Sequence, residues 1–162
     1  MKNDDFIERI VAAYSDTVIR IAYQYTVCMQ DAEDIAQEVF LSLVNKQIRD
    51  YDDEHLKAYI IRATVNKCHS FHRAKQAEDI VYLDEVYKNE NEPILTVEER
   101  EILIEVNSLP KRYRDVIYLY YYEDYTVAEI ADILGVKTGT VTSRLKRARE
   151  KLRPILEEDH YG

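Results

Sequence analysis

Apolar residues recur every three or four positions along most of this chain, which is the spacing of one face of an α-helix. The pattern predicts five helices, over residues 5–28, 31–44, 53–75, 96–107 and 111–122, and then a helical pair between Tyr125 and Arg153. Strand-like alternation is weak, and glycine and proline are scarce, at three each. We therefore predict an all-α fold.

The last helical pair is predicted to be joined by a tight turn. Thr126 and Glu129 have the spacing of a capping box at the start of a helix, and Gly135 is placed to end it. The second helix carries an apolar face, formed by Val141, Leu145, Ala148 and Leu152. This order of elements predicts a helix-turn-helix, whose second helix lies in the major groove of DNA.

The charge distribution supports a DNA-binding role for the last helix. Seven lysines or arginines and a single acid fall between Lys137 and Arg153, so this stretch carries a net charge of +6. The rest of the chain carries −15, because the whole chain is at −9. An acidic protein is not a general nucleic-acid binder. DNA contact is therefore expected to be local, or to need a partner that adds affinity. A solvated basic helix is the alternative interpretation.

Other chemistry finds little support in the sequence. Cys68, His69 and His72 lie close together, but no fourth zinc ligand is evident, and no phosphate loop or nucleophile motif is present. We predict no metal, no cofactor and no enzymatic activity. Cys28 and Cys68 are expected to be reduced thiols. No membrane helix and no signal peptide are evident, so we predict a cytoplasmic protein without membrane insertion.

An acidic stretch divides the two helical halves. Six acidic residues and one lysine occupy residues 77–95, which also contain Pro93. We therefore predict a helical domain over 1–76, an acidic linker over 77–95 and a second helical domain over 96–157. In the second domain, Pro110 is expected in the first turn of the helix over 111–122.

The helix predicted over 31–44 has an apolar inner side and an acidic outer side. Asp31 is placed as its N-cap residue. The inner side is formed by Ala32, Ile35, Ala36, Val39, Phe40 and Leu43, and the outer side by Asp34, Gln37, Glu38 and Leu41. The outer side is either an ordinary solvated face or a surface that binds a partner.

The helix predicted over 53–75 becomes basic toward its C-terminus. Its buried side is expected to be Leu56, Tyr59, Ile60, Ala63, Val65, Cys68 and Phe71. The basic half suits melted nucleic acid, or it only complements the helix dipole. The tyrosines at 118–122 leave a similar choice, between base stacking and positions in or near the core, and we favour the core.

Three stretches, taken together, carry a family resemblance. In chain order they read DAEDIAQEVFLSL, LKAYIIRATVNKCHSFHR and LPKRYRDVIYLYYYEDYTVAEIADILGVKTGTVTSRLKRAREKL. They resemble the core-binding motif of region 2, the promoter-melting helix and region 4 of the extracytoplasmic-function (ECF) sigma factors, a group within the sigma-70 family. The resemblance covers nearly the whole chain apart from the predicted linker. Tyr59 stands where the family usually has tryptophan.

The resemblance implies a sigma factor that binds bacterial core RNA polymerase and directs promoter recognition and transcription initiation. The first domain would bind the β′ clamp helices through Asp34, Gln37, Glu38 and Leu41. It would engage the −10 element through the loop over 45–53 and through Tyr59, Arg62, Asn66, Lys67 and Arg73. The second domain would sit on the β flap. An inhibitory anti-sigma factor is a common further partner in the family.

The resemblance also implies that the helix after Gly135 reads the −35 element. The candidate contacts are Lys137, Thr138, Thr140, Ser143, Arg144, Lys146, Arg147 and Arg149. We expect Arg144 or Arg147 to meet a base edge, and Lys146 and Arg149 to meet phosphates. The alternatives are a stand-alone helix-turn-helix regulator that binds DNA as a dimer, and a helical adaptor whose basic helix meets an acidic partner.

Overall fold

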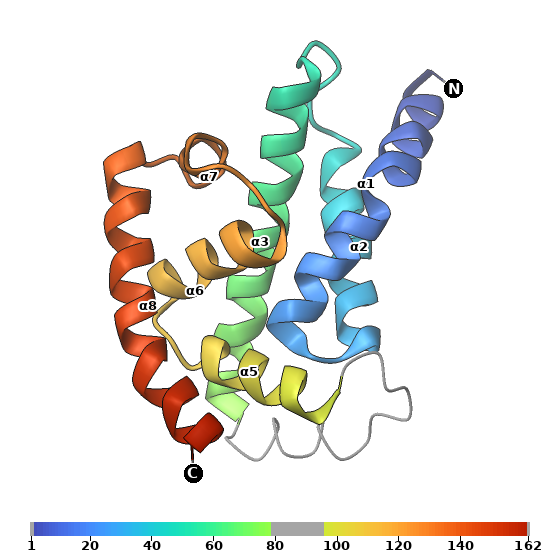
Figure 1. The fold of residues 1–162 in the computed structure, drawn as a ribbon. Helices are drawn as coiled ribbons and strands as arrows, with labels where there is room; N and C mark the ends of the chain where they lie inside the picture. The colour runs from blue at the N-terminus through green and yellow to red at the C-terminus, as the bar shows by residue number, and fades with distance from the viewer. Residues whose placement is uncertain (1, 79–95, 162) are drawn as a thin grey trace. The chain divides into compact units, whose positions relative to one another are not determined.

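A computed structural model describes the backbone of residues 2–78 and 96–161, with side chains over 5–75 and 96–153. All but the first two residues of the predicted linker lie outside this described part. The chain divides into two compact units, Met1–Glu90 and Asn91–Gly162. Every regular element in the described residues is helical (Figure 1). The predicted all-α fold is confirmed.

The first unit contains three helices, α1 (Lys2–Thr26), α2 (Met29–Leu43) and α3 (Asp53–Glu78). Each of the three packs against the other two (Figure 1). Ile21, Val39 and Ile60 are almost completely buried where the helices meet. Burial of an aliphatic side chain of this size stabilises the fold by about 1.5–3 kcal/mol. No described helix of the chain is long and apolar enough to cross a membrane.

The junction between α1 and α2 differs from the prediction. The backbone N–H of Val27, at a φ of 51°, donates to the carbonyl of Tyr23 and ends α1. The prediction that Asp31 caps the second helix is wrong, because Cys28 is the N-cap residue and its carbonyl accepts from the N–H of Ala32 at 3.0 Å. Asp31 therefore lies in the first turn, where the helix dipole also favours a carboxylate.

The buried side of α3 is wider than predicted. Ile61 and Thr64 are buried, whereas Tyr59, Ala63 and Phe71 are only half-buried. The reason is that α3 contacts both α1 and α2, so its buried stripe is rotated and broadened. The hydroxyl of Thr64 donates to the carbonyl of Ile60 at 2.8 Å, which satisfies it within the core. Likewise Phe40 on α2, predicted to face inward, is only half-buried.

The second unit contains α5 (Val97–Asn107), α6 (Lys111–Ile117), η1 (Tyr118–Tyr122), α7 (Val127–Leu134) and α8 (Thr138–Tyr161). Helices α5, α6 and α7 each pack against α8. The N-terminus of α5 has a capping box. The N–H of Glu99 donates to the Thr96 hydroxyl at 3.1 Å, and the N–H of Thr96 donates to the Glu99 carboxylate at 2.9 Å.

The helix predicted over 111–122 is interrupted. Pro110 is the N-cap residue rather than part of the first turn, and after Ile117 the chain forms the π-helical turn η1. The wider turn buries Tyr118, whose hydroxyl donates to Asn107 Oδ1 at 2.9 Å. It directs the next three tyrosines outward, with exposed fractions of 36–48%. The core position that we favoured for this tyrosine cluster is therefore correct for Tyr118, whereas the other three tyrosines lie at the surface and are only partly buried.

Candidate functional site

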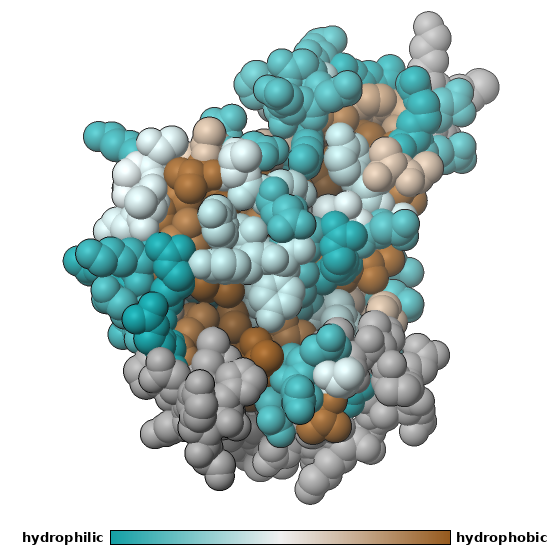
Figure 2. Space-filling model, viewed as in Figure 1, coloured by the Kyte–Doolittle hydropathy of each residue, from teal (hydrophilic) through white to brown (hydrophobic). Residues whose placement is uncertain are grey.

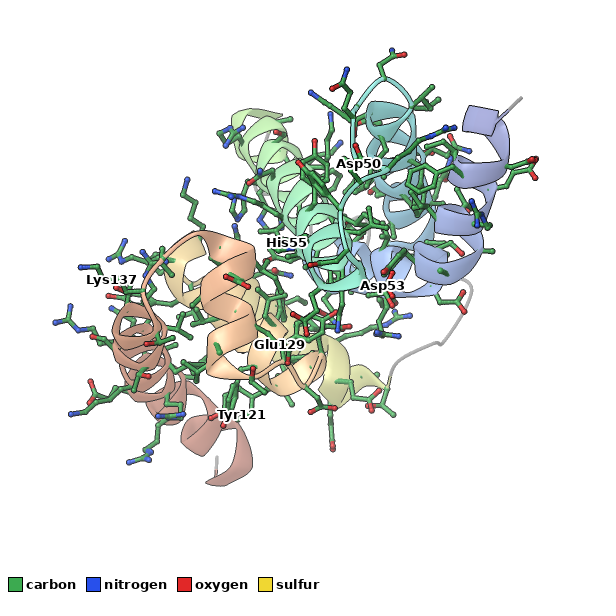
Figure 3. The ribbon with its side chains drawn as sticks, turned by 90° about the horizontal axis from the view of Figure 1, so that it is seen from above. Asp50, Asp53, His55, Tyr121, Glu129 and Lys137 are labelled. Atoms are coloured by element: carbon green, nitrogen blue, oxygen red, sulfur yellow. The ribbon has the colours of Figure 1, made fainter. Side chains whose placement is uncertain are left out.

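The turn between α7 and α8 forms as predicted. The N–H of Glu129 donates to the Thr126 hydroxyl, and the N–H of Thr126 donates to the Glu129 carboxylate, both at 3.1 Å. Gly135 has a φ of 68°, which an L-residue rarely adopts, and the N–H of Val136 donates to the carbonyl of Ala131 at 3.0 Å. Lys137 then leads into α8 (Figure 3). The helix-turn-helix is confirmed.

Helix α8 has one apolar side and a polar remainder. Its buried residues are those predicted, Val141, Leu145, Ala148 and Leu152. Hydrophilic side chains gather along its outer side (Figure 2). Because this unit buries only the apolar stripe, most of the basic side chains of α8 remain available to a ligand.

A cavity of about 420 Å³ lies between α6 and α8. Its lining residues are Arg112, Tyr113, Gly139, Thr140, Ser143, Arg144 and Arg147. Three of these carry guanidinium groups and none is acidic. The cavity brings together four predicted −35 residues, Thr140, Ser143, Arg144 and Arg147. The sequence analysis missed Arg112 and Tyr113, because their place in the cavity depends on how α6 packs.

The hydroxyl of Tyr113 lies in a positive environment. The Arg112 guanidinium lies 4.5 Å from the centre of the Tyr113 ring, and the Lys151 ammonium lies 5.7 Å from it. Hydrogen bonding from Arg112, and next from Arg147, lowers the pKa of the Tyr113 hydroxyl below its usual value. An oxygen that carries negative charge is therefore stabilised at this place.

The remaining −35 candidates do not join this cavity. Arg149 donates to the Tyr121 hydroxyl at 3.0 Å, which directs it toward η1. Arg144 and Arg149 are five positions apart, and so lie about 140° apart around the helix. Lys146 is exposed and does not line the cavity, Thr138 begins α8, and Lys137 precedes it. The basic residues thus occupy two flanks of α8 and its N-terminal turn.

The predicted acidic face of α2 is solvent-exposed. Asp34, Gln37, Glu38 and Leu41 all lie on the exposed side, at the spacing of one helix face. Leu41, the apolar member of this face, is 70% exposed. This face therefore presents acidic, amide and apolar groups together to the solvent.

The predicted −10 residues on α3 form a face with one exception. Tyr59, Arg62, Asn66 and Arg73 are spaced at three, four and seven residues, which places them on one side of the helix. This side is continued by Ser70, whose hydroxyl accepts from Arg73 at 3.0 Å. Lys67 is the exception, because it turns toward α2 and lies 3.9 Å from the Glu38 carboxylate.

The loop between α2 and α3 contributes a residue that the sequence analysis missed. Tyr51 packs edge-on against Tyr59, with ring centres 5.9 Å apart, and is 43% exposed. Ile48 is buried and fixes the loop against the core. Its place in the loop over 45–53 was the only signal available in the sequence.

The histidines near Cys68 have structural contacts. The Nε2 atom of His72 lies 2.7 Å from the Tyr25 carbonyl oxygen, and the rings of His69 and His72 both pack edge-on against Tyr25. Cys68 is buried and, like Cys28, not in a disulfide. Within the described residues, no group of three histidine, cysteine, aspartate or glutamate side chains is arranged to hold a metal ion.

Taken together, the fold and these surfaces define a two-unit helical DNA-binding protein with a C-terminal helix-turn-helix. Family models agree with this class: "Sigma-70 region 2" matches residues 10–78, and "Sigma-70, region 4" matches residues 99–152. The chain belongs to the sigma-70 family, in its group of ECF RNA polymerase sigma factors. This family is regulatory rather than catalytic.

Known proteins show the same relationship. The chain is 32% identical to the RNA polymerase sigma factor SigV of Bacillus subtilis, over 86% of this chain and 84% of that protein. It is 29% identical to the ECF RNA polymerase sigma factor SigW of the same species, over 96% of this chain and 91% of that protein. The ECF RNA polymerase sigma factor SigE of Mycolicibacterium smegmatis is 29% identical over 92% of this chain, which spans only 61% of that protein.

Solved structures share the fold. The sigma factor RpoE from Bartonella quintana, in complex with the anti-sigma factor NepR, has a TM-score of 0.71 at 21% identity, over 94% of this chain and 97% of that one. CnrH, in complex with the cytosolic domain of CnrY, has a TM-score of 0.66 at 22% identity, over 94% of this chain and 88% of that one.

Proposed function

We propose that this chain is the promoter-recognition subunit of a bacterial RNA polymerase. It would bind the core enzyme and direct transcription initiation from promoters with −10 and −35 elements. The observation that carries the proposal is the presence of two kinds of surface in one chain. An acidic face with an exposed leucine lies on α2, and a basic helix-turn-helix lies in the second unit.

The acidic face of α2 is the proposed contact with the β′ clamp helices of core polymerase. Asp34, Gln37 and Glu38 would form its polar part, and Leu41 would add an apolar contact at its C-terminal end. Glu38 is also near Lys67, but a surface ion pair of this kind contributes little, so the carboxylate remains available. The second unit would contact the β flap.

The −10 element would be bound by α3 and the loop before it. Arg62, Asn66 and Arg73 provide polar contacts along one side of α3. The Tyr51–Tyr59 pair supports this proposal, because an exposed tyrosine ring offers a stacking surface for an unpaired base. Tyr59 would then take the part of the tryptophan that is usual in the family.

The −35 element would be read by α8. Arg144 or Arg147 would meet a base edge, whereas the other basic residues suit phosphates. The net charge of −9 means that the free chain should bind DNA weakly. Attachment to polymerase would make the two DNA contacts bivalent and so raise the effective affinity.

Further partners and location follow from the same proposal. An anti-sigma factor is a proposed inhibitory partner, since the two sigma-like structures above were solved as complexes with other proteins. A subunit of RNA polymerase would work in the cytoplasm, without a cofactor and without catalytic activity of its own.

Reconstituted transcription tests the proposal. Purified chain and bacterial core polymerase would be incubated with a pool of templates randomised across the −35 and −10 positions, and the transcripts would be sequenced. We expect transcripts only when both proteins are present, with conserved bases at two positions one promoter spacer apart. Transcripts identical to those of core polymerase alone would refute the proposal.

A further inference from the structure

We propose that the cavity between α6 and α8 is a phosphate-binding site, which holds one backbone phosphate of the DNA that α8 reads. The inference rests on the proposed function and extends it to Arg112 and Tyr113 of α6, outside the helix-turn-helix. It predicts that α6 contributes a DNA contact of its own.

The charge and shape of the cavity fit a phosphate. Arg112 lines it from α6, and Arg144 and Arg147 line it from α8, while none of its described lining residues is acidic. The hydroxyls of Thr140 and Ser143 add donors on the α8 side. Arginine is the residue best suited to a phosphate, because its planar donors match two phosphate oxygens at once. The cavity has room for the group, at about 420 Å³.

The N-terminus of α8 strengthens the site. Gly139, in the first turn, also lines the cavity, whereas the N–H of Thr140 already donates to the carbonyl of Lys137 at 3.0 Å. The helix dipole favours an anion at that end. A Cβ built on Gly139 would meet no atom within 4 Å, so this wall of the cavity is open to an incoming group.

Arg112 is held in place before any ligand arrives. Its guanidinium lies on the Tyr113 ring, whose side chain is only 4% exposed and therefore fixed by the core. A preorganised arginine loses less side-chain entropy on binding. The same arginines lower the pKa of the Tyr113 hydroxyl, which agrees with a preference for negative charge on oxygen at this place.

A DNA phosphate is favoured over a free phosphorylated molecule by position. Ser143, Arg144 and Arg147 line the cavity and also belong to the predicted reading side of α8. A duplex lying against these residues would therefore bring its backbone to the cavity. Helix-turn-helix proteins commonly contact the backbone through elements that precede the reading helix.

The test compares Arg112→Ala with Lys111→Ala, each in the full chain assembled with core polymerase. Lys111 is exposed, adjacent on α6 and absent from the cavity, so its variant removes the same charge from the neighbouring position. The probe is a duplex carrying the −35 sequence selected in the transcription experiment. We expect Arg112→Ala to weaken binding about tenfold at low salt, equally for all sequences, and to reduce the salt slope by about 1. Lys111→Ala should leave both unchanged.

Neutral phosphate substitution locates the contact. In the wild type, a methylphosphonate at one backbone position should weaken binding as much as Arg112→Ala does. In Arg112→Ala the same methylphosphonate should weaken binding no further. A duplex with the methylphosphonate one helical turn away serves as the control. Equal affinity and salt slope for Arg112→Ala and Lys111→Ala would overturn the inference.

Two further arms separate the possible failures. Calorimetry of the free chain with inorganic phosphate tests whether the ligand is a free phosphate instead. The assignment to DNA would be overturned if the wild type binds inorganic phosphate saturably, Arg112→Ala does not bind it, and Arg112→Ala has the same DNA affinity as the wild type. If the wild type fails to assemble with core polymerase, the proposed function fails. Arg112→Ala and Lys111→Ala are then compared as free chains on a random-sequence duplex. Equal salt slopes for the two variants would also refute the proposed phosphate site.

Discussion

Arg144 and Arg147 lie one turn apart on the side of α8 that borders the cavity. We predict that replacing both with alanine weakens binding to the selected −35 sequence by about 1–3 kcal/mol for each arginine that reads a base edge, and reduces the preference over other sequences. Assembly with core polymerase should not change, because these residues lie far along the chain from the acidic face of α2.

The control for this prediction is Arg149→Ala. Arg149 lies on the opposite flank of the same helix and donates to Tyr121. Its removal should weaken binding to every sequence alike or leave it unchanged, so that the sequence preference stays intact. Competition between the selected −35 duplex and a scrambled duplex measures both effects. Full sequence preference in the Arg144→Ala/Arg147→Ala variant would contradict the assignment.

Tyr113 provides a prediction that depends on pH. Its folded-state pKa lies below the usual 10.0, first because of hydrogen bonding from Arg112. Ionisation of this hydroxyl therefore stabilises the folded state. This stabilisation is complete above the pKa that Tyr113 has in the unfolded chain, and it is lost as the pH falls through the pKa that Tyr113 has in the folded chain. Arg112→Ala should raise the pKa of Tyr113.

Site-resolved NMR with labelled tyrosine rings can measure these pKa values. Tyr113 should titrate first, whereas burial raises the pKa of Tyr122 and, together with the charge of Asp53, that of Tyr14. These two tyrosines serve as internal controls, because neither lines the cavity. A Tyr113 pKa that is equal in the wild type and in Arg112→Ala would show that Arg112 does not act on it.

At the scale of elements, η1 is held by the buried Tyr118. Its hydroxyl donates to Asn107 Oδ1 at 2.9 Å, which links η1 to the end of α5. Tyr118→Phe removes this hydrogen bond, so we predict a decrease of about 1 kcal/mol in the free energy of unfolding of the second unit. Urea unfolding followed by circular dichroism would measure it.

Tyr120→Phe is the matched control for that substitution. Tyr120 is the exposed tyrosine two positions further along η1, and removal of its hydroxyl should change the free energy of unfolding by less than about 0.5 kcal/mol. If the two variants have equal stability, the Tyr118–Asn107 hydrogen bond does not hold η1 in place.

Elements defined by local chemistry were predictable from the sequence. The capping boxes at Thr96 and Thr126 and the left-handed Gly135 each depend on residues within a few positions. Asp31 was misassigned because an aspartate suits both an N-cap and a first turn. The π-helical η1 was missed because helical periodicity does not distinguish it from a continued α-helix. The cavity was missed because its two walls meet only through the packing of α6 on α8.

Across the molecule as a whole, the role of a sigma factor requires one chain to bind two different partners. The acidic face on α2 and the basic residues of α8 belong to separate units and have opposite charge. A sigma factor uses both surfaces at once, whereas a stand-alone regulator needs only the second. The acidic face of α2 is therefore the feature that distinguishes these two functions.

The most direct test of the central claim is co-elution with bacterial core RNA polymerase. The wild type is compared with Asp34→Lys/Glu38→Lys and with Glu8→Lys/Asp16→Lys, which makes the same charge change at exposed positions of α1. We predict one-to-one binding by the wild type and by the α1 variant, and binding at least a hundredfold weaker, about 2.7 kcal/mol, in the α2 variant. Specific DNA binding by a wild type that does not bind polymerase would contradict the account and indicate a stand-alone regulator.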